Sequence, residues 1–557
     1  MNLELEFERL TFRRTEAHNS AQSVVEGTLA LPAGAPEIGR ALKLEASANL
    51  SGVEVKDGKV IFEGTLNYQL LYARFEERPF HYGAPDEDEE GREAYGRPDE
   101  LGPGAGEVLE KAAWKRETPF AFVLELPGAV EGDAVEASVE VEECSFDVRP
   151  DRLTLDVDAV LSFSARKERV EEVHVATAAR SEAVSAQSRP VRVRTLLGTG
   201  TAATEARGEL GFTGFAAPQA LVRVEADPEV TEAFVDDGEV RVRGYVHCTA
   251  LYMGADGTGP QYGRWSRGLD FEVAVPVAGA RRGADADVKV AAATPEARVV
   301  PASDGRELSV RAPLTVTVTV HDTRKVPVVT ALTSDRAEVA VRTERVLLVE
   351  AVGEGSVTER AETRLELQGG LPDIERVLWG EAKARVDDVH VLGDKVAVEF
   401  HVDVEMVYVG RSDGEEGVRV ARWPKAVEMD VEIPLEGAEP GLERRAWVKV
   451  ESVDFDVINR ECVDARVVVT ACAAVSREVE LEAVVEAAFI PPEDASPPTY
   501  TFVVTGPGDT VWKLAARYRT KPEVIVQANE WLAGVEGELP TGRKVCVPRR
   551  VRPEPAA

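Results

Sequence analysis

A fourteen-residue stretch occurs three times in this chain, and it constrains the fold more than any other feature of the sequence. KVIFEGTLNYQLLY begins at Lys59, EVRVRGYVHCTALY begins at Glu239, and KVAVEFHVDVEMVY begins at Lys395. The copies are offset by about 180 and then about 156 residues, and the similarity extends upstream of each copy without a gap. Regular internal repetition of this kind indicates one structural unit that is used three times.

Apolar residues recur at alternate positions of the repeated stretch, which predicts a β-strand with one face on a core. The polar positions between them are Glu63, Thr65, Asn67 and Gln69 in the first copy, and Glu399, His401, Asp403 and Glu405 in the third. We therefore expect antiparallel sheets whose second face meets water. Gly64 and Gly244 share one repeat position, which predicts a bend or bulge there.

A second shared block follows each copy, beginning at Phe120, Phe271 and Val427. It contains a strand, a turn rich in Pro or Gly, and another alternating strand, which is typical of a sandwich of short strands. The sequence therefore predicts a mainly β chain with three repeated antiparallel β-sandwich-like domains. We place these domains at 1–185, 186–335 and 336–489.

The first domain carries an acidic insert near 80–112 that the other two lack. Its low hydrophobicity and its Gly and Pro content are typical of a loop between strands. A docking segment for a partner is the other interpretation.

The charge and the hydrophobic pattern exclude some classes of partner. The 557 residues carry a formal net charge of −34 at pH 7, whereas a nucleic acid backbone is bound by clustered Lys and Arg. We therefore expect no nucleic acid partner. The sequence shows no signal peptide and no run of about eighteen apolar residues. We expect a cytoplasmic protein that is not an integral membrane protein.

The sequence offers little that is typical of catalysis or of a bound cofactor. HExxH and GxxxxGK[ST] are absent, and the five cysteines include no CxxC pair. His247 and His401 lie on repeated strands but not at equivalent positions, so they do not form a repeated set of ligands. We expect a protein that is not an enzyme, with no catalytic residues, no metal and no cofactor. A buried polar cluster confined to one of the three domains would instead indicate an enzyme.

A separate small domain is expected at 499–550, after a proline-rich linker at 490–498. The strand YTFVV is followed by Asp509 and Thr510, which are typical helix-capping residues. Pro522 is suited to the first turn of a second helix. With a closing strand, the predicted order is β-α-α-β.

This tail resembles a LysM domain in Gly508-Asp509-Thr510, in Ile525 and Asn529, and in the segment from Leu539 to Pro548. LysM domains bind glycans that contain N-acetylglucosamine, or in some members a protein, in a shallow groove between two loops. The resemblance implies a groove formed by Gly508, Asp509, Thr510, Asn529, Glu530 and Trp531. Helix capping is an equally good explanation of Asp509 and Thr510.

The body resembles the SPOCS domain of SipL-like spore-coat morphogenesis proteins. The similarity lies in the strand that begins at Lys59, in LPAGAPEIGRALKLEA before it and in ELPG after it. Three such domains and one LysM domain imply a noncatalytic scaffold on the forespore surface, in the mother-cell cytosol. They also imply that the LysM domain binds a coat morphogenetic protein such as SpoIVA. The alternative is a protein of the cell wall or spore cortex that binds peptidoglycan through its LysM domain.

Overall fold

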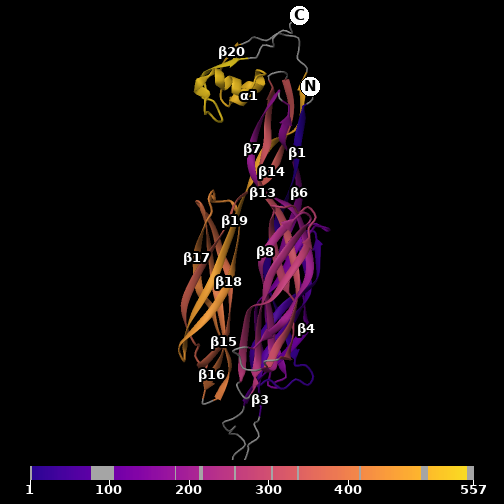
Figure 1. Cartoon of the computed structure of the whole chain (residues 1–557), viewed down its shortest axis with the longest axis vertical. Helices are drawn as coiled ribbons and strands as arrows, with labels where there is room; N and C mark the ends of the chain where they lie inside the picture. Colours follow the sequence, from indigo (N-terminus) through magenta and orange to yellow (C-terminus); the bar gives the residue numbers. More distant parts are fainter. Residues whose placement is uncertain are drawn as a thin grey trace, which may run out of the picture.

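The computed structural model describes residues 3–76, 106–181, 183–212, 218–255, 259–302, 305–334, 338–412, 415–490 and 500–548. Most of the acidic insert expected near 80–112, and nearly all of the linker expected at 490–498, lie outside the described residues. The chain forms an elongated molecule (Figure 1). Three β-sandwiches lie at one end, a narrow stalk of strands follows, and a small domain with helices lies at the tip.

The first sandwich packs two three-stranded antiparallel sheets face to face. Its strands are β1 (Glu4–Ala30), β2 (Arg40–Lys56), β3 (Lys59–Glu76), β4 (Gly106–Glu125), β5 (Val135–Val148) and β6 (Thr154–Arg180). The strand order is β2-β3-β4 in one sheet and β1-β6-β5 in the other. Alternate apolar side chains of both sheets meet in one core, as a period of two requires.

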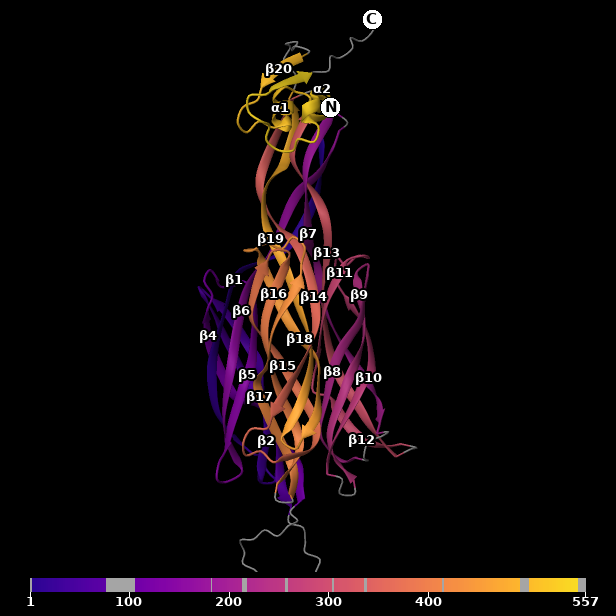
Figure 2. The same ribbon diagram turned by 90° about the vertical axis from the view of Figure 1, so that its left-hand side faces the viewer.

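The second and third sandwiches repeat this arrangement (Figure 2). Their strands are β7 (Val184–Gly211), β8 (Pro218–Asp236), β9 (Glu239–Gly254), β10 (Pro260–Pro276), β11 (Asp285–Ala292), β12 (Glu296–Ala302) and β13 (Gly305–Ser334), then β14 (Glu338–Glu366), β15 (Asp373–Leu392), β16 (Lys395–Ser412), β17 (Glu415–Pro434), β18 (Glu443–Asn459) and β19 (Cys462–Ile490). Sheet β10-β9-β8 packs on β11-β13-β7, and sheet β15-β16-β17 packs on β14-β19-β18. The prediction of a mainly β, antiparallel fold is confirmed.

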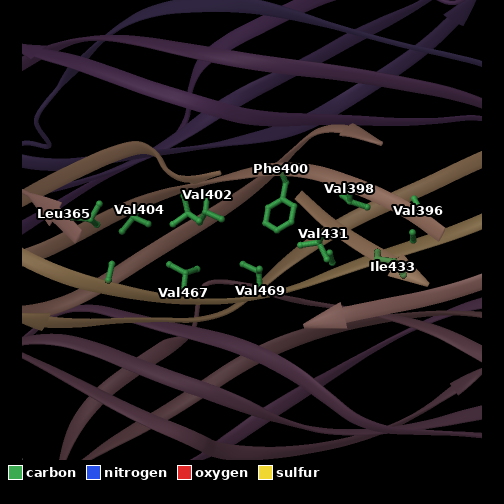
Figure 3. Close-up of a cluster of buried hydrophobic side chains, with 14 of the residues drawn as sticks. Leu365, Val396, Val398, Phe400, Val402, Val404, Val431, Ile433, Val467 and Val469 are labelled. Carbon is green, nitrogen blue, oxygen red and sulfur yellow. The ribbon is translucent and has the colours of Figure 1, made fainter. Parts of the chain in front are cut away.

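The repeated stretch forms the central strand of one sheet in each sandwich, namely β3, β9 and β16. Its apolar positions fill the cores. Figure 3 shows Phe400 and Val402 of β16 facing Val467 and Val469 of the opposite sheet. The alternation in the sequence therefore exists because every second side chain is buried between two sheets.

An equivalent tryptophan connects the two sheets of each sandwich. Trp114, Trp265 and Trp423 donate indole hydrogen bonds of 2.6, 2.8 and 2.8 Å to the carbonyl oxygens of Ala30, Gly211 and Glu366, the last residues of β1, β7 and β14. Sequence reasoning did not single out these tryptophans. Trp114 and Trp265 each lie six residues before the second shared block, whereas Trp423 lies four residues before it, so an ungapped comparison aligns only the first two.

Gly64 and Gly244 lie where a ring from the neighbouring strand crosses the backbone. A Cβ atom on Gly64 would lie 2.4 Å from Phe120, and one on Gly244 would lie 2.7 Å from Phe271. In β16 the equivalent residue is Phe400, which supplies a ring itself. A register shift lies opposite each of the two glycines, in β2 and in β8. The expected bulge is therefore present, but on the neighbouring strand.

Six long strands continue beyond the sandwiches as three two-stranded ribbons, β1–β6, β7–β13 and β14–β19. Each ribbon contributes to one shared stalk core, whose buried residues are Leu10, Phe12, Val173 and Val175, then Val191, Val193, Val326 and Val328, then Leu348, Val479, Leu481 and Ala483. The three repeats are thus joined by common tertiary packing (Figure 1).

The sheets β2-β3-β4, β8-β9-β10 and β15-β16-β17 also contact one another, at what we call the three-unit interface. Leu71, Leu251 and Val407 occupy the same repeat position and belong to one buried cluster there. They lie on the strand face that we expected to meet water. His401, on the same face of β16, is buried beside Asp387 at 2.8 Å. The expectation of a hydrated second face is wrong for these residues. Neighbouring repeats cover Leu71, Leu251 and Val407, and Asp387 of the same repeat contacts His401.

The C-terminal domain consists of β20 (Tyr500–Val504), α1 (Val511–Arg517), α2 (Pro522–Ala528), a short 3₁₀ helix (Glu530–Leu532) and β21 (Lys544–Pro548). The two strands pair antiparallel, so the predicted β-α-α-β order is confirmed. Leu514, Ile525 and Val545 form the centre of its core. Across the part of the chain that the structure describes, no helix combines the length and apolar character needed to span a membrane.

Candidate binding surface of the C-terminal domain

Asp509 holds together the loop between β20 and α1. Its buried carboxylate accepts hydrogen bonds from the Gly506 amide at 2.8 Å and from the Arg517 guanidinium at 3.3 Å. Its carbonyl oxygen accepts a hydrogen bond from the Leu539 amide at 2.7 Å. The Asp509 carboxylate thus has its hydrogen-bond partners within the domain, as a buried carboxylate requires.

Thr510 caps α1, as its sequence position predicts. Its side chain accepts a hydrogen bond from the Lys513 amide at 3.1 Å. Gly508 precedes this cap with φ +74°, a conformation that favours glycine. The Lys513 ammonium donates to the Gly508 carbonyl oxygen at 2.7 Å. Helix capping therefore accounts for the contacts of Thr510.

Asn529 links the end of α2 to β21. Its amide nitrogen donates to the carbonyl oxygens of Ile525 and Cys546, both at 2.7 Å, and its Oδ1 accepts from the Cys546 amide at 2.8 Å. The side chain is buried and uses its polar groups within the domain. The role of Asn529 in joining α2 to β21 thus explains why the motif has an asparagine at this position.

Glu530 and Trp531 follow Asn529 and reach the surface. Trp531 is 39% exposed, and the Arg543 guanidinium carbon lies 5.9 Å from its ring centroid, within the range of a cation–π contact. Arg543 was not among the predicted site residues. The signal that could have indicated it is the basic character of the tail, where Thr499 to Arg550 holds eight Lys and Arg against five Asp and Glu.

The turn between α1 and α2 rests on the tip of the stalk. The Thr333 hydroxyl of β13 donates to the Thr520 carbonyl oxygen at 2.9 Å, and both residues are buried. Arg519 pairs with Glu338 of β14. The predicted groove residues lie at the other ends of these helices, before α1 and after α2. The contact with the stalk therefore leaves Trp531 and its neighbours accessible.

A cluster of charged side chains lies in the three-unit interface. Lys43 is buried, and its ammonium lies 3.0 Å from Glu45, 2.5 Å from Glu381 and 2.7 Å from Glu405. The equivalent of Lys43 in the second repeat is Arg223, which also contacts Glu45. All three repeats supply residues to this cluster. The cluster is therefore part of the interface between the repeats. It is not the polar cluster within a single domain that would indicate an enzyme.

The environment of this cluster shifts two carboxyl groups in opposite directions. Burial favours a higher pKa for Glu381, but Lys43, Trp379 and Arg223 together outweigh burial, and the pKa is lowered. Partial burial between the units raises the pKa of Glu225, and Arg223 offsets this effect only in part. The interface therefore favours the charge of one carboxylate and disfavours that of the other.

Other chemistry is sparse in the described residues. No group of three or more His, Cys, Asp or Glu side chains among them could hold a metal ion. GRSDG at Gly410 has the spacing of a nucleophile elbow, which sequence reasoning overlooked. However, Gly410 and Ser412 end β16, and the next element is β17. The next described element after Ser412 is therefore a strand, whereas a nucleophile elbow leads into a helix.

Comparison with known proteins matches two families. Residues 37–149, 219–299 and 373–458 match the SipL, SPOCS domain family, and residues 503–548 match the LysM domain family. The six stalk strands fall outside the matched segments. The curated proteins and the solved structures gave no match.

Both matched families are noncatalytic binding domains, and together they indicate a sporulation- or envelope-associated protein with a LysM domain for binding. The SPOCS matches alone cover half of the sequence. With three SPOCS domains and a C-terminal LysM domain, this chain belongs to the SipL family.

Proposed function

We propose that this protein is a noncatalytic scaffold of spore-coat assembly whose LysM domain binds a coat morphogenetic protein of the SpoIVA type. In this proposal it acts in the mother-cell cytosol, at the forespore surface. The observation that supports it best is the contact of Arg519 and Thr520 with the stalk. This contact gives the LysM domain a defined orientation at the tip of an elongated body, which suits a scaffold that holds a partner at a distance.

The surface left accessible at the predicted groove favours a protein partner. Asp509 and Asn529 use their polar groups within the domain, so a partner would meet Trp531, Glu530 and Arg543. An aromatic ring beside charged side chains is typical of protein interfaces.

Peptidoglycan binding is the second candidate function. It is favoured by the exposed ring of Trp531, because an accessible indole can also lie against the apolar face of a sugar. Under this alternative the LysM domain would attach the body to the cell wall or to the spore cortex.

Direct binding of the full chain distinguishes the two functions. Calorimetry or interferometry would compare a purified SpoIVA-type coat protein with soluble muropeptides, using wild type and Trp531→Ala. Trp447→Ala is the matched control, since Trp447 is also 39% exposed and Arg445 lies 5.6 Å from its ring centroid. We expect saturable binding to the coat protein that Trp531→Ala weakens and Trp447→Ala leaves unchanged. Binding to muropeptides alone would refute the coat-scaffold proposal.

A further inference from the structure

The outer face of the two-stranded sheet in the LysM domain is unusually apolar. Tyr500, Phe502 and Val504 alternate along β20, and their exposed fractions are 62%, 61% and 66%. The intervening Thr501 and Val503 face the helices and are less exposed. A run of three large apolar side chains on one open face marks an interaction surface, whereas a single exposed apolar residue does not.

Basic side chains border this apolar stripe. The Lys544 ammonium lies 4.4 Å from the Phe502 ring centroid, and Lys544 pairs with Val504 across the sheet. Arg543, the residue before it, contacts the ring of Trp531. An apolar centre beside the Lys544 cation is complementary to a protein surface with apolar side chains and a carboxylate rim. The chain as a whole, by contrast, carries a formal net charge of −34.

Among the residues that the structure describes, the position of the sheet leaves this face free of the stalk. The α1–α2 turn contacts the stalk through Thr520, and α1 packs near β13. Figure 2 shows β20 at the outer end of the domain, with the helices between the strands and the stalk. A stripe of apolar side chains thus lies at the end of an elongated scaffold, where a partner can approach it directly.

We propose that the outer face of β20 and β21 is a protein docking surface, centred on Phe502 and distinct from the groove around Trp531. Its occupant is an acidic protein surface with exposed apolar side chains. This inference deepens the proposed function and rests on it, since the coat morphogenetic protein is the partner that would carry that surface. The apolar stripe supplies contact area, and Lys544 supplies charge complementarity.

The test measures binding of the full chain to the purified SpoIVA-type protein and, separately, to soluble muropeptides. Phe502→Thr with Val504→Thr removes two of the three apolar side chains of the stripe but keeps residues that favour strands. We expect about tenfold weaker binding to the protein, because burial of one large side chain contributes on that order. Lys544→Glu should weaken binding and reduce its dependence on salt. The control is Phe234→Thr, since Phe234 is 47% exposed and Arg243 lies 6.0 Å from its ring centroid.

The outcomes separate this inference from the proposed function. Loss of protein binding in the β20 variant, with Phe234→Thr unchanged, supports the docking surface. Unchanged protein binding in the β20 variant overturns the docking surface and leaves the scaffold proposal intact. If wild type fails to bind the protein, both proposals are overturned. Loss of muropeptide binding alone in the β20 variant would identify the face as a glycan site and refute protein docking.

Discussion

Substitution of Gly64 by alanine tests whether the repeated strands depend on a close approach between backbone and ring. A Cβ atom at this position would lie 2.4 Å from the Phe120 ring and 2.6 Å from the Asn49 carbonyl oxygen. The ring is buried in the first sandwich, and the carbonyl belongs to the backbone of β2, so neither can move away freely. Overpacking of this kind costs about 1–3 kcal/mol. We expect Gly64→Ala to lower the free energy of unfolding by about 2 kcal/mol.

Gly52 provides the matched control in the adjacent strand. A Cβ atom there would have no neighbour closer than 3.8 Å. Gly52→Ala should therefore be neutral or stabilise by about 0.5 kcal/mol, because alanine restricts the unfolded chain. Urea titrations followed by circular dichroism would measure both variants, with comparison of midpoints at equal slope. Equal stability of Gly64→Ala and Gly52→Ala would refute the reasoning. Addition of Phe120→Leu to Gly64→Ala should recover part of the loss.

Three further predictions concern two partly buried carboxyl groups and one buried amide. Glu225→Gln should stabilise the chain at pH 7, and the gain should vanish as the pH falls below the ordinary value of 4.5, because the raised pKa of Glu225 makes its charged form costly in the folded state. Glu381→Gln should destabilise the chain at pH 7, and this loss of stability should disappear on acidification through the lowered pKa of Glu381. Urea midpoints measured from pH 3 to pH 8 would check both variants. A change in stability of the same sign for both variants would contradict the opposite pKa shifts. Asn529→Ala should cost about 2–3 kcal/mol, because it leaves the Cys546 backbone groups without partners. Hydrogen exchange in α2 and β21 would detect this loss, and exposed Gln527→Ala should show no comparable change.

In the LysM domain, the residues that carry the sequence motif are not the residues that form the accessible surface at the predicted groove. Asp509, Thr510 and Asn529 carry the resemblance to a LysM domain, yet their side chains make the loop, the helix cap and the link to β21. A sequence motif records whichever residues a fold requires, whether or not a ligand touches them. Trp531 was predicted and is exposed, but its neighbour Arg543, which directly precedes β21, was not predicted, because their contact depends on the fold of the domain.

The sequence by itself determined the repeated strands, their antiparallel sheets and the small β-α-α-β domain, because alternation, turn residues and helix caps act over a few neighbouring residues. Tertiary structure decided how the repeats combine. Leu71 lies on the strand face that the sequence predicts to be hydrated, and Lys43 is charged, yet both are buried where the sheets of three repeats meet. The stalk likewise required six strands from three repeats to share one core. Such contacts join residues hundreds of positions apart, and a local pattern shows which face is apolar without showing what covers it.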